Sequence, residues 1–127
     1  MIDHLVLRTA NFHAMRQFYD KVLGALGYLR IEDFRTPAGQ HMSAFGLSEV
    51  PGFWLSEGDS PSGMHLAFAA PSEHAVRSFH ALGLSEGGQD NGEPMLRPHY
   101  HAAYFAAYLL DPDGNNVEAV HHGDQAS

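Results

Sequence analysis

Two histidines and one glutamate are the residues of this chain with the best prospect of metal chemistry. His4 opens the apolar stretch "HLVL", and His65 opens a similar stretch, "HLAF", 61 residues later. Glu118 stands inside a third apolar run, "NNVEAV". Two imidazoles and one carboxylate are a competent ligand set for a divalent metal ion, and they leave coordination positions open for substrate and water. We therefore predict a metal site made of His4, His65 and Glu118.

Each of these residues has a plainer interpretation when taken alone. A histidine at the start of a strand is usually a satisfied polar residue, and a lone glutamate on a short edge strand is usually solvated. The combination favours a metal site, because the two histidines are equivalent in the internal repeat described below and the acid lies on an otherwise apolar strand. With the strand period of two, Glu118 shares a face with Asn116, Val120 and His122.

The segment "LRPHYHAAYFAAY" is a second candidate region, because histidine and aromatic side chains are concentrated in it. A histidine in the loop before this strand could act as a general acid or base, and a tyrosine could donate a hydrogen bond to a bound oxyanion. The alternative is a polar loop with ordinary aromatic packing. The predicted catalytic residues are His99, Tyr100 and His101, and the predicted substrate-binding residues are Trp54, Arg97, Tyr104 and Tyr108.

The elements that must position these side chains belong to an internal repeat. "HLVLRTANFHAMRQFY", from His4, aligns without a gap with "HLAFAAPSEHAVRSFH", from His65, with six identities in 16 positions. Each copy predicts a strand followed by a helix, with Asn11 and Ser72 as the N-caps. The first helix is expected to end near Gly24 or Gly27 and the second at Gly83. The first helix carries an apolar stripe made of Phe12, Met15, Phe18, Tyr19, Val22, Leu23 and Leu26.

Three extended segments are predicted after each helix, so both halves have the order strand-helix-strand-strand-strand. The first three are "YLRIEDFR", "HMSAFGL" and "GFWLSE". In the second half a glycine-rich stretch, "EGGQDNGEP", precedes "MLRP", "AYFAAYLL" and "NNVEAVHH". The chain therefore predicts one α+β domain over residues 1–127, with module one at about 1–58 and module two at about 62–122. Residues 56–63 are the natural join.

Composition narrows the classes of partner. The net charge is −8 and there is one lysine, which argues against nucleic acid or an anionic membrane as a partner. Without cysteine there is no disulfide, thiolate metal site or cysteine nucleophile, as fits a reducing, cytoplasmic location. The opening "MIDHLVLRTA" does not have the pattern of a signal peptide, and no apolar run approaches the ~20 residues of a membrane span.

The repeat, the opening "DHLVLRTANFHAMRQFYDKVLGALGY" and the ending "DPDGNNVEAV" resemble the vicinal oxygen chelate (VOC) superfamily, which includes glyoxalase I, extradiol dioxygenases and bleomycin-resistance proteins. The resemblance covers essentially the whole chain. It implies two βαβββ modules in tandem that form a cupped mixed sheet with the helices outside, around a divalent metal. It also implies ligands from the first and last strands of the modules, which are His4, His65 and Glu118 here.

The fourth ligand position of the family falls on Trp54, which cannot bind a metal, and Glu57 is a poorer candidate. This departs from the four protein ligands of glyoxalase I and is similar to the two-histidine, one-carboxylate site of extradiol dioxygenases. The resemblance implies a substrate that chelates Fe, Mn, Ni or Zn through two neighbouring oxygens. Iron would suit a ring-cleaving dioxygenase, and the other metals a glyoxalase-like isomerase or lyase.

Two alternatives to an enzyme stay open. One is a binding protein of the bleomycin-resistance type, which holds a cationic drug in an acidic groove, and the net charge of −8 is compatible with it. The other is a member that holds a metal without turnover. Exposed sheet edges favour a homodimer, in which the modules pair either within one chain or between two chains.

Overall fold

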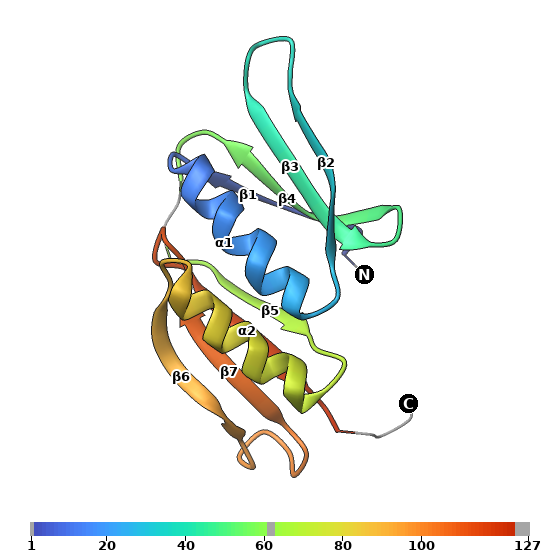
Figure 1. Cartoon of the computed structure of the whole chain (residues 1–127), viewed down its shortest axis with the longest axis vertical. Helices are drawn as coiled ribbons and strands as arrows, with labels where there is room; N and C mark the ends of the chain where they lie inside the picture. The colour runs from blue at the N-terminus through green and yellow to red at the C-terminus, as the bar shows by residue number, and fades with distance from the viewer. Residues whose placement is uncertain (1, 61–62, 124–127) are drawn as a thin grey trace.

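The computed structural model describes residues 2–60 and 63–123 and shows two modules of the same construction. Each module runs strand-helix-strand-strand-strand, so the predicted α+β class with tandem βαβββ modules is confirmed (Figure 1). The first module consists of β1 (Leu5–Thr9), α1 (Phe12–Ala25), β2 (Leu29–Arg35), β3 (His41–Leu47) and β4 (Val50–Glu57). The second consists of β5 (His65–Ala69), α2 (Glu73–Ser85), β6 (Gln89–Leu96), β7 (Phe105–Leu110) and β8 (Asn116–His121).

The strands form two four-stranded mixed sheets with the orders β1-β4-β3-β2 and β5-β8-β7-β6. In each sheet the first strand is parallel to the last strand of its module, and the other pairs are antiparallel. Val6 pairs with Trp54 in one sheet, and Ala67 pairs with Glu118 in the other. Because Val6 and Ala67 are equivalent in the repeat, Trp54 occupies the position of Glu118 in its own module.

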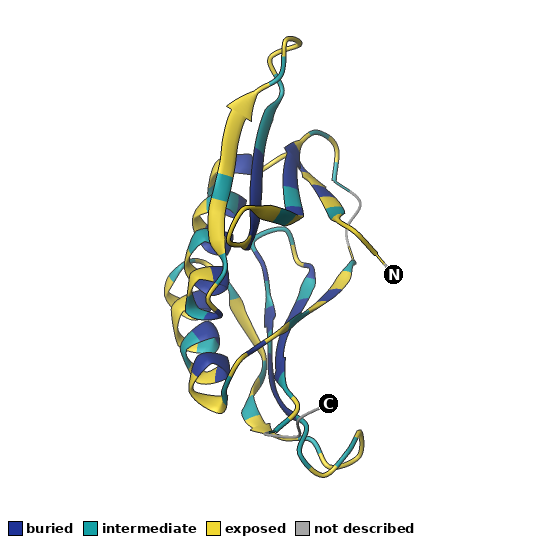
Figure 2. Cartoon of the chain, turned by 90° about the vertical axis from the view of Figure 1, so that its right-hand side faces the viewer, coloured by how far each residue is buried: buried dark blue, intermediate teal, exposed yellow. Residues whose placement is uncertain are grey.

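Helices α1 and α2 lie side by side on one face of the molecule, and the buried residues of each helix face the sheets (Figures 1 and 2). The predicted stripe of α1 is buried throughout, because residues three and four apart share one side of a helix. In α2, Val76 and Phe79 are fully buried, whereas Leu82 is 38% exposed, unlike the core position expected for it. Neither helix in the described part of the chain has the length and apolar content of a membrane span.

The helix ends follow the sequence signals in part. Ser72 caps α2, and its hydroxyl accepts a hydrogen bond from the Ala75 N–H at 3.1 Å. Asn11 occupies the N-cap position of α1, but its side chain makes no capping bond. Helix α1 ends before Gly27, whose φ of +93° suits the left-handed position after a helix. The predicted end of α2 at Gly83 is wrong, since the helix continues to Ser85 and Gly87 takes the left-handed position.

Gly83 serves close packing within α2. A Cβ atom there would collide with Leu109 Cδ1 of β7 and would lie 3.1 Å from Val22 Cγ1 of α1. Glycine therefore lets the two helices and the second sheet approach one another at this point.

Substituting Gly83 with alanine is expected to destabilise the protein by about 1–2 kcal/mol, because overpacking costs about 1–3 kcal/mol and the better helix propensity of alanine offsets about 1 kcal/mol. The matched control is Gly24→Ala in α1, where an added Cβ meets nothing within 4 Å. That change should be neutral or stabilising by up to about 1 kcal/mol. The measurement is urea unfolding of both variants, and equal midpoints would contradict the packing role of Gly83.

Much of the glycine-rich stretch of the second module belongs to a strand, whereas the sequence predicted an extended segment only from "MLRP" onward. Strand β6 starts at Gln89, and its pairing with β7 shifts register on both sides of Gly92. Gly92 has a φ of +154°, and a Cβ there would lie 2.8 Å from Tyr108 Cδ1. The glycine therefore permits an irregular strand to pass close to a tyrosine ring.

A buried polar network joins the first module to the turn between β7 and β8. The Tyr19 hydroxyl of α1 donates to Asp111 Oδ2 at 2.6 Å. Asp111 Oδ1 accepts from the backbone N–H groups of Asp113 at 2.9 Å and Asn115 at 3.0 Å. Asn115 Oδ1 in turn accepts from the Met64 N–H at 3.1 Å, just ahead of β5. The "DPDGN" motif is therefore a connection between modules as well as a turn.

Candidate functional site

Glu118 lies in the middle of β8 and points away from the core residues Val117 and Ala119 on either side of it. Its side chain is only 3% exposed. Oε1 lies 3.0 Å from His65 Nε2, and Oε2 accepts a hydrogen bond of 2.5 Å from the Tyr104 hydroxyl. Within the described residues no lysine or arginine forms an ion pair with Glu118. A buried carboxylate is costly without a nearby positive charge, and a metal ion bound between Glu118 and His65 would supply one.

His65 begins β5 and is half exposed at 53% of its side-chain surface. Its Nδ1 lies 3.1 Å from Asn116 Nδ2, and Asn116 Oδ1 accepts from Asn91 Nδ2 at 3.1 Å. These amides orient the ring, so that Nε2 faces Glu118. The residues fit a metal, since two ligands bound at about 2.1 Å and at right angles or slightly more lie about 3.0–3.4 Å apart, close to the 3.0 Å between His65 Nε2 and Glu118 Oε1.

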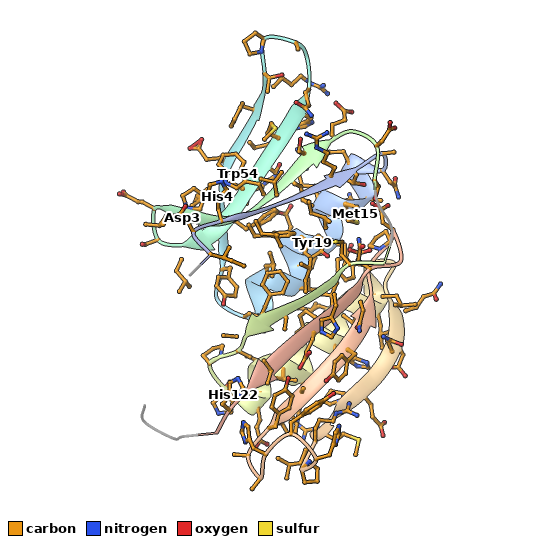
Figure 3. All side chains as sticks on the ribbon, turned by 180° about the vertical axis from the view of Figure 1, so that it is seen from behind. Asp3, His4, Met15, Tyr19, Trp54 and His122 are labelled. Carbon is orange, nitrogen blue, oxygen red and sulfur yellow. The ribbon has the colours of Figure 1, made fainter. Side chains whose placement is uncertain are left out.

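His4 lies elsewhere, just ahead of β1. Its Nδ1 is 2.8 Å from Asp3 Oδ1, and the side chain is 52% exposed. With Trp54 it lines an open hollow of about 450 Å³ on the first module, where Figure 3 shows the two side chains together. Over residues 2–60 and 63–123, no three histidine, aspartate or glutamate side chains gather to hold a metal ion. A single chain therefore pairs His65 with Glu118 but does not bring His4 to them.

Two tyrosines are neighbours of Glu118: Tyr108 lies on β7, and Tyr104 lies just before that strand. Burial, together with the hydrogen bond to Glu118 and its negative charge, raises the pKa of Tyr104 to about 12. Burial and the same carboxylate also raise the pKa of Tyr108 well above its usual value. Tyr108 stands directly opposite Glu118 in the sheet and packs edge-on against the His65 ring at 6.3 Å. Both hydroxyls therefore stay protonated at neutral pH and can act as hydrogen-bond donors.

The histidine-rich loop divides into two groups. Arg97, His99, Tyr100 and Tyr108 line one polar hollow of about 260 Å³, together with Asn91 and Asn116. His101 lies apart from this hollow, since its Nε2 is 2.9 Å from His122 Nδ1. The rings of His101 and His122 both pack against Tyr104, at 5.3 Å in each case. The structure therefore places Tyr104 and Tyr108 beside Glu118 and His65, and it places Arg97, His99 and Tyr100 in the neighbouring hollow that Tyr108 also lines.

Two sets of contacts were not predicted from the sequence. Asn91 belongs to the His65 environment, but it lies in the glycine-rich stretch, for which the sequence predicted no site residue. His41, which is not among the predicted site residues, lies 2.7 Å from Asp33 Oδ1, and the same carboxylate accepts from Ser43 and pairs with Arg16. Burial raises the pKa of Asp33, but the hydrogen bonds from Ser43 and His41 and the charge of Arg16 outweigh it, so the net shift is downward.

Solved structures of similar proteins share this fold. A glyoxalase/bleomycin resistance protein from Albidiferax ferrireducens is 28% identical, with a TM-score of 0.76 over 94% of this chain and 97% of that chain. A glyoxalase/bleomycin resistance protein/dioxygenase family enzyme from Burkholderia phytofirmans is 20% identical, with a TM-score of 0.70 over 94% and 97%. Glyoxalase I from Zea mays is 18% identical, with a TM-score of 0.72 over 96% of this chain and 46% of that chain. The curated proteins contain no match.

The family model agrees with the repeat, the strand order and the structural neighbours. The model of the Glyoxalase/Bleomycin resistance protein/Dioxygenase superfamily matches residues 1–119. This match spans both modules and includes His4, His65 and Glu118. The chain belongs to the Glyoxalase/Bleomycin resistance protein/Dioxygenase superfamily.

Proposed function

We propose that the protein is a metal-dependent enzyme of the glyoxalase or extradiol dioxygenase type, which acts on a small substrate with two neighbouring oxygens. The observation that carries this proposal is the buried Glu118 carboxylate, which faces His65 at 3.0 Å and has no lysine or arginine partner in the described part of the chain. A divalent ion at this pair would supply the missing positive charge and act as a Lewis acid on the substrate oxygens. The metal is Fe, Mn, Ni or Zn.

In this proposal the third ligand, His4, comes from a second copy of the chain. His4 Nδ1–H donates a hydrogen bond to Asp3 Oδ1, which leaves Nε2 available, as is usual for a metal ligand. Around His4 the apolar side chains of Val6, Phe34 and Val50 are 47%, 42% and 70% exposed. An exposed apolar surface of this kind favours a partner, and the unpaired edges of β1 and β5 are further places for chains to meet. We therefore propose a homodimer with shared sites.

The other residues have roles that follow from their contacts. Tyr104 holds Glu118 Oε2 and so orients the carboxylate. Tyr108, which stays protonated at neutral pH, donates a hydrogen bond to a substrate oxygen that develops negative charge. His99 lies in the same hollow as Tyr108 and is the proposed general acid or base. His101 is bonded to His122, so its contribution is to the packing around Tyr104.

Metal content of the tag-free protein tests this function. We expect about one ion per chain in the wild type, as one two-histidine, one-carboxylate site requires. His65→Ala and His4→Ala should each lose the ion. Mixing these two variants as refolded dimers distinguishes the assemblies, because each mixed dimer with shared sites regains one complete site. About a quarter of the wild-type metal content should then return. Unchanged metal content in His65→Ala would refute the metal site, and no recovery on mixing would refute sharing between chains.

A binding protein of the bleomycin-resistance type is the second candidate. The observation in its favour is the aromatic hollow of the first module. There Trp54 stands at the family's fourth metal-ligand position and packs edge-on against Phe34 at 6.1 Å. Tight binding of a cationic drug that a metal chelator leaves unchanged would favour this function over the enzyme. The cytoplasmic location remains a prediction from composition.

A further inference from the structure

Arg97 supplies the positive charge of the polar hollow beside the candidate metal site. Its guanidinium lies over the Tyr108 ring, with Cζ at 5.2 Å from the ring centre. Nη2 donates to the backbone oxygens of Glu93 at 2.5 Å and Ala106 at 3.4 Å. These contacts hold the guanidinium in one place on the wall of a hollow of about 260 Å³. The cation is therefore positioned before any ligand arrives.

The charge of Arg97 has no carboxylate partner in residues 2–60 and 63–123. No ion pair involves it there, and its Nε is buried without a hydrogen-bond acceptor. No acidic side chain lines the hollow. Asp90 is close enough to interact electrostatically with Arg97, but its carboxylate already bonds His80 Nε2 at 2.9 Å and the Gly92 N–H at 3.0 Å. Because no acidic side chain in these residues pairs with the guanidinium, an anionic ligand in the hollow would be stabilised by its charge.

We propose that the hollow binds a carboxylate of the substrate, with Arg97 as the specificity-determining residue. Since Nη2 already donates to two backbone oxygens, Nη1 is the group that would donate a charged hydrogen bond to a carboxylate oxygen of the substrate. The inference rests on the proposed function, because the hollow adjoins the metal pair. Asn116 lines the hollow and lies 3.1 Å from His65 Nδ1, and Tyr108 lies between Arg97 and His65. The substrate class is therefore a small carboxylic acid that carries its vicinal oxygens on another part of the molecule.

A pair of probes that differ in one charge tests this inference. Protocatechuate carries two neighbouring hydroxyls and a carboxylate, and its amide has the same shape without the charge. We expect the wild type to bind the acid at least about tenfold more tightly than the amide, since a charged hydrogen bond contributes about 1.5–3 kcal/mol. Arg97→Gln should lose this preference, and Arg97→Lys should keep part of it. Arg77→Gln is the control, because Arg77 is exposed on α2 and lies over Phe105 away from the hollow.

Calorimetric titration of chelator-treated and metal-loaded protein separates this proposal from the metal site. If the chain takes up no metal, the preference of the chelator-treated protein for the acid still tests Arg97. The ratio of the two affinities within one variant is insensitive to a small loss of folded protein, and thermal unfolding checks that Arg97→Gln folds. Equal binding of acid and amide, no binding of either, or a preference that survives in Arg97→Gln would overturn the proposal. So would inorganic phosphate that binds as tightly as the acid.

Discussion

Asp111→Ala is expected to destabilise the protein by about 3–5 kcal/mol, because several buried donors lose their acceptor and each costs about 1–3 kcal/mol. The donors are the Tyr19 hydroxyl, the Asn115 side-chain amide and two backbone N–H groups of the turn. Since small proteins have a total stability of only about 5–15 kcal/mol, this is a large share. Urea unfolding, followed by far-ultraviolet circular dichroism, gives the difference.

The same turn contains its own control. Asp113 carries the same charge but is partly exposed, and its Oδ2 accepts a long hydrogen bond of 3.4 Å from Ser60 Oγ. Asp113→Ala should therefore change stability by less than about 0.5 kcal/mol, as surface substitutions usually do. Tyr19→Phe removes the hydroxyl that donates to Asp111 and should lower the free energy of unfolding by about 1–2 kcal/mol. If the Asp111 and Asp113 variants unfold at the same urea concentration, the network does not join the modules in the way described.

Glu118→Gln is expected to lower metal affinity more than about 100-fold, because losing a hydrogen-bond partner of a ligand already costs about 10–100-fold. The metal-free protein should respond in the opposite way. An amide in this buried position no longer needs a compensating charge, so the free energy of unfolding should stay equal or rise by about 1 kcal/mol. Competition with a chelating dye measures the affinity, and urea unfolding of the metal-free protein measures the stability.

This pair of opposite effects is the signature of a residue kept for function at a cost in stability. Glu49→Gln is the matched control, since Glu49 is exposed in the turn between β3 and β4. It should leave metal affinity and stability unchanged. Wild-type metal affinity in Glu118→Gln would contradict the proposed ligand role. Lower stability of the metal-free variant would instead mean that the carboxylate stabilises the fold through His65 and Tyr104.

The helices and the modular order of the fold were predictable from local pattern. The apolar residues of α1 recur every three or four positions, and such a stripe is buried in whatever core the helix joins. The hydroxyl of Ser72 caps α2 through a contact three residues away, which depends on little else. The equivalence of Trp54 and Glu118 was an implication of the family resemblance, and it is confirmed because both modules pair their first and last strands in the same register.

Glycines and polar partners were less predictable, because their roles depend on residues distant in the chain. Gly83 has the residue type of a helix end, yet Leu109 and Val22 make it a packing position inside α2. Gly92 has the residue type of a loop, yet Tyr108 makes it a close passage within a strand. His41 finds Asp33 only when β2 and β3 pair.

The candidate site also has a part that the sequence predicted and a part that depended on the tertiary structure. The residue types and spacing of His4, His65 and Glu118 by themselves indicated metal chemistry, since a repeated histidine and an acid on an apolar strand are readable from a one-dimensional pattern. Only the tertiary structure decided which of them meet. Parallel pairing of β5 with β8 places His65 beside Glu118, whereas His4 lies in a separate hollow on the other sheet. The physical reason is that hydrogen-bonded register acts within one sheet, while the placement of two sheets depends on how the helices and side chains between them pack.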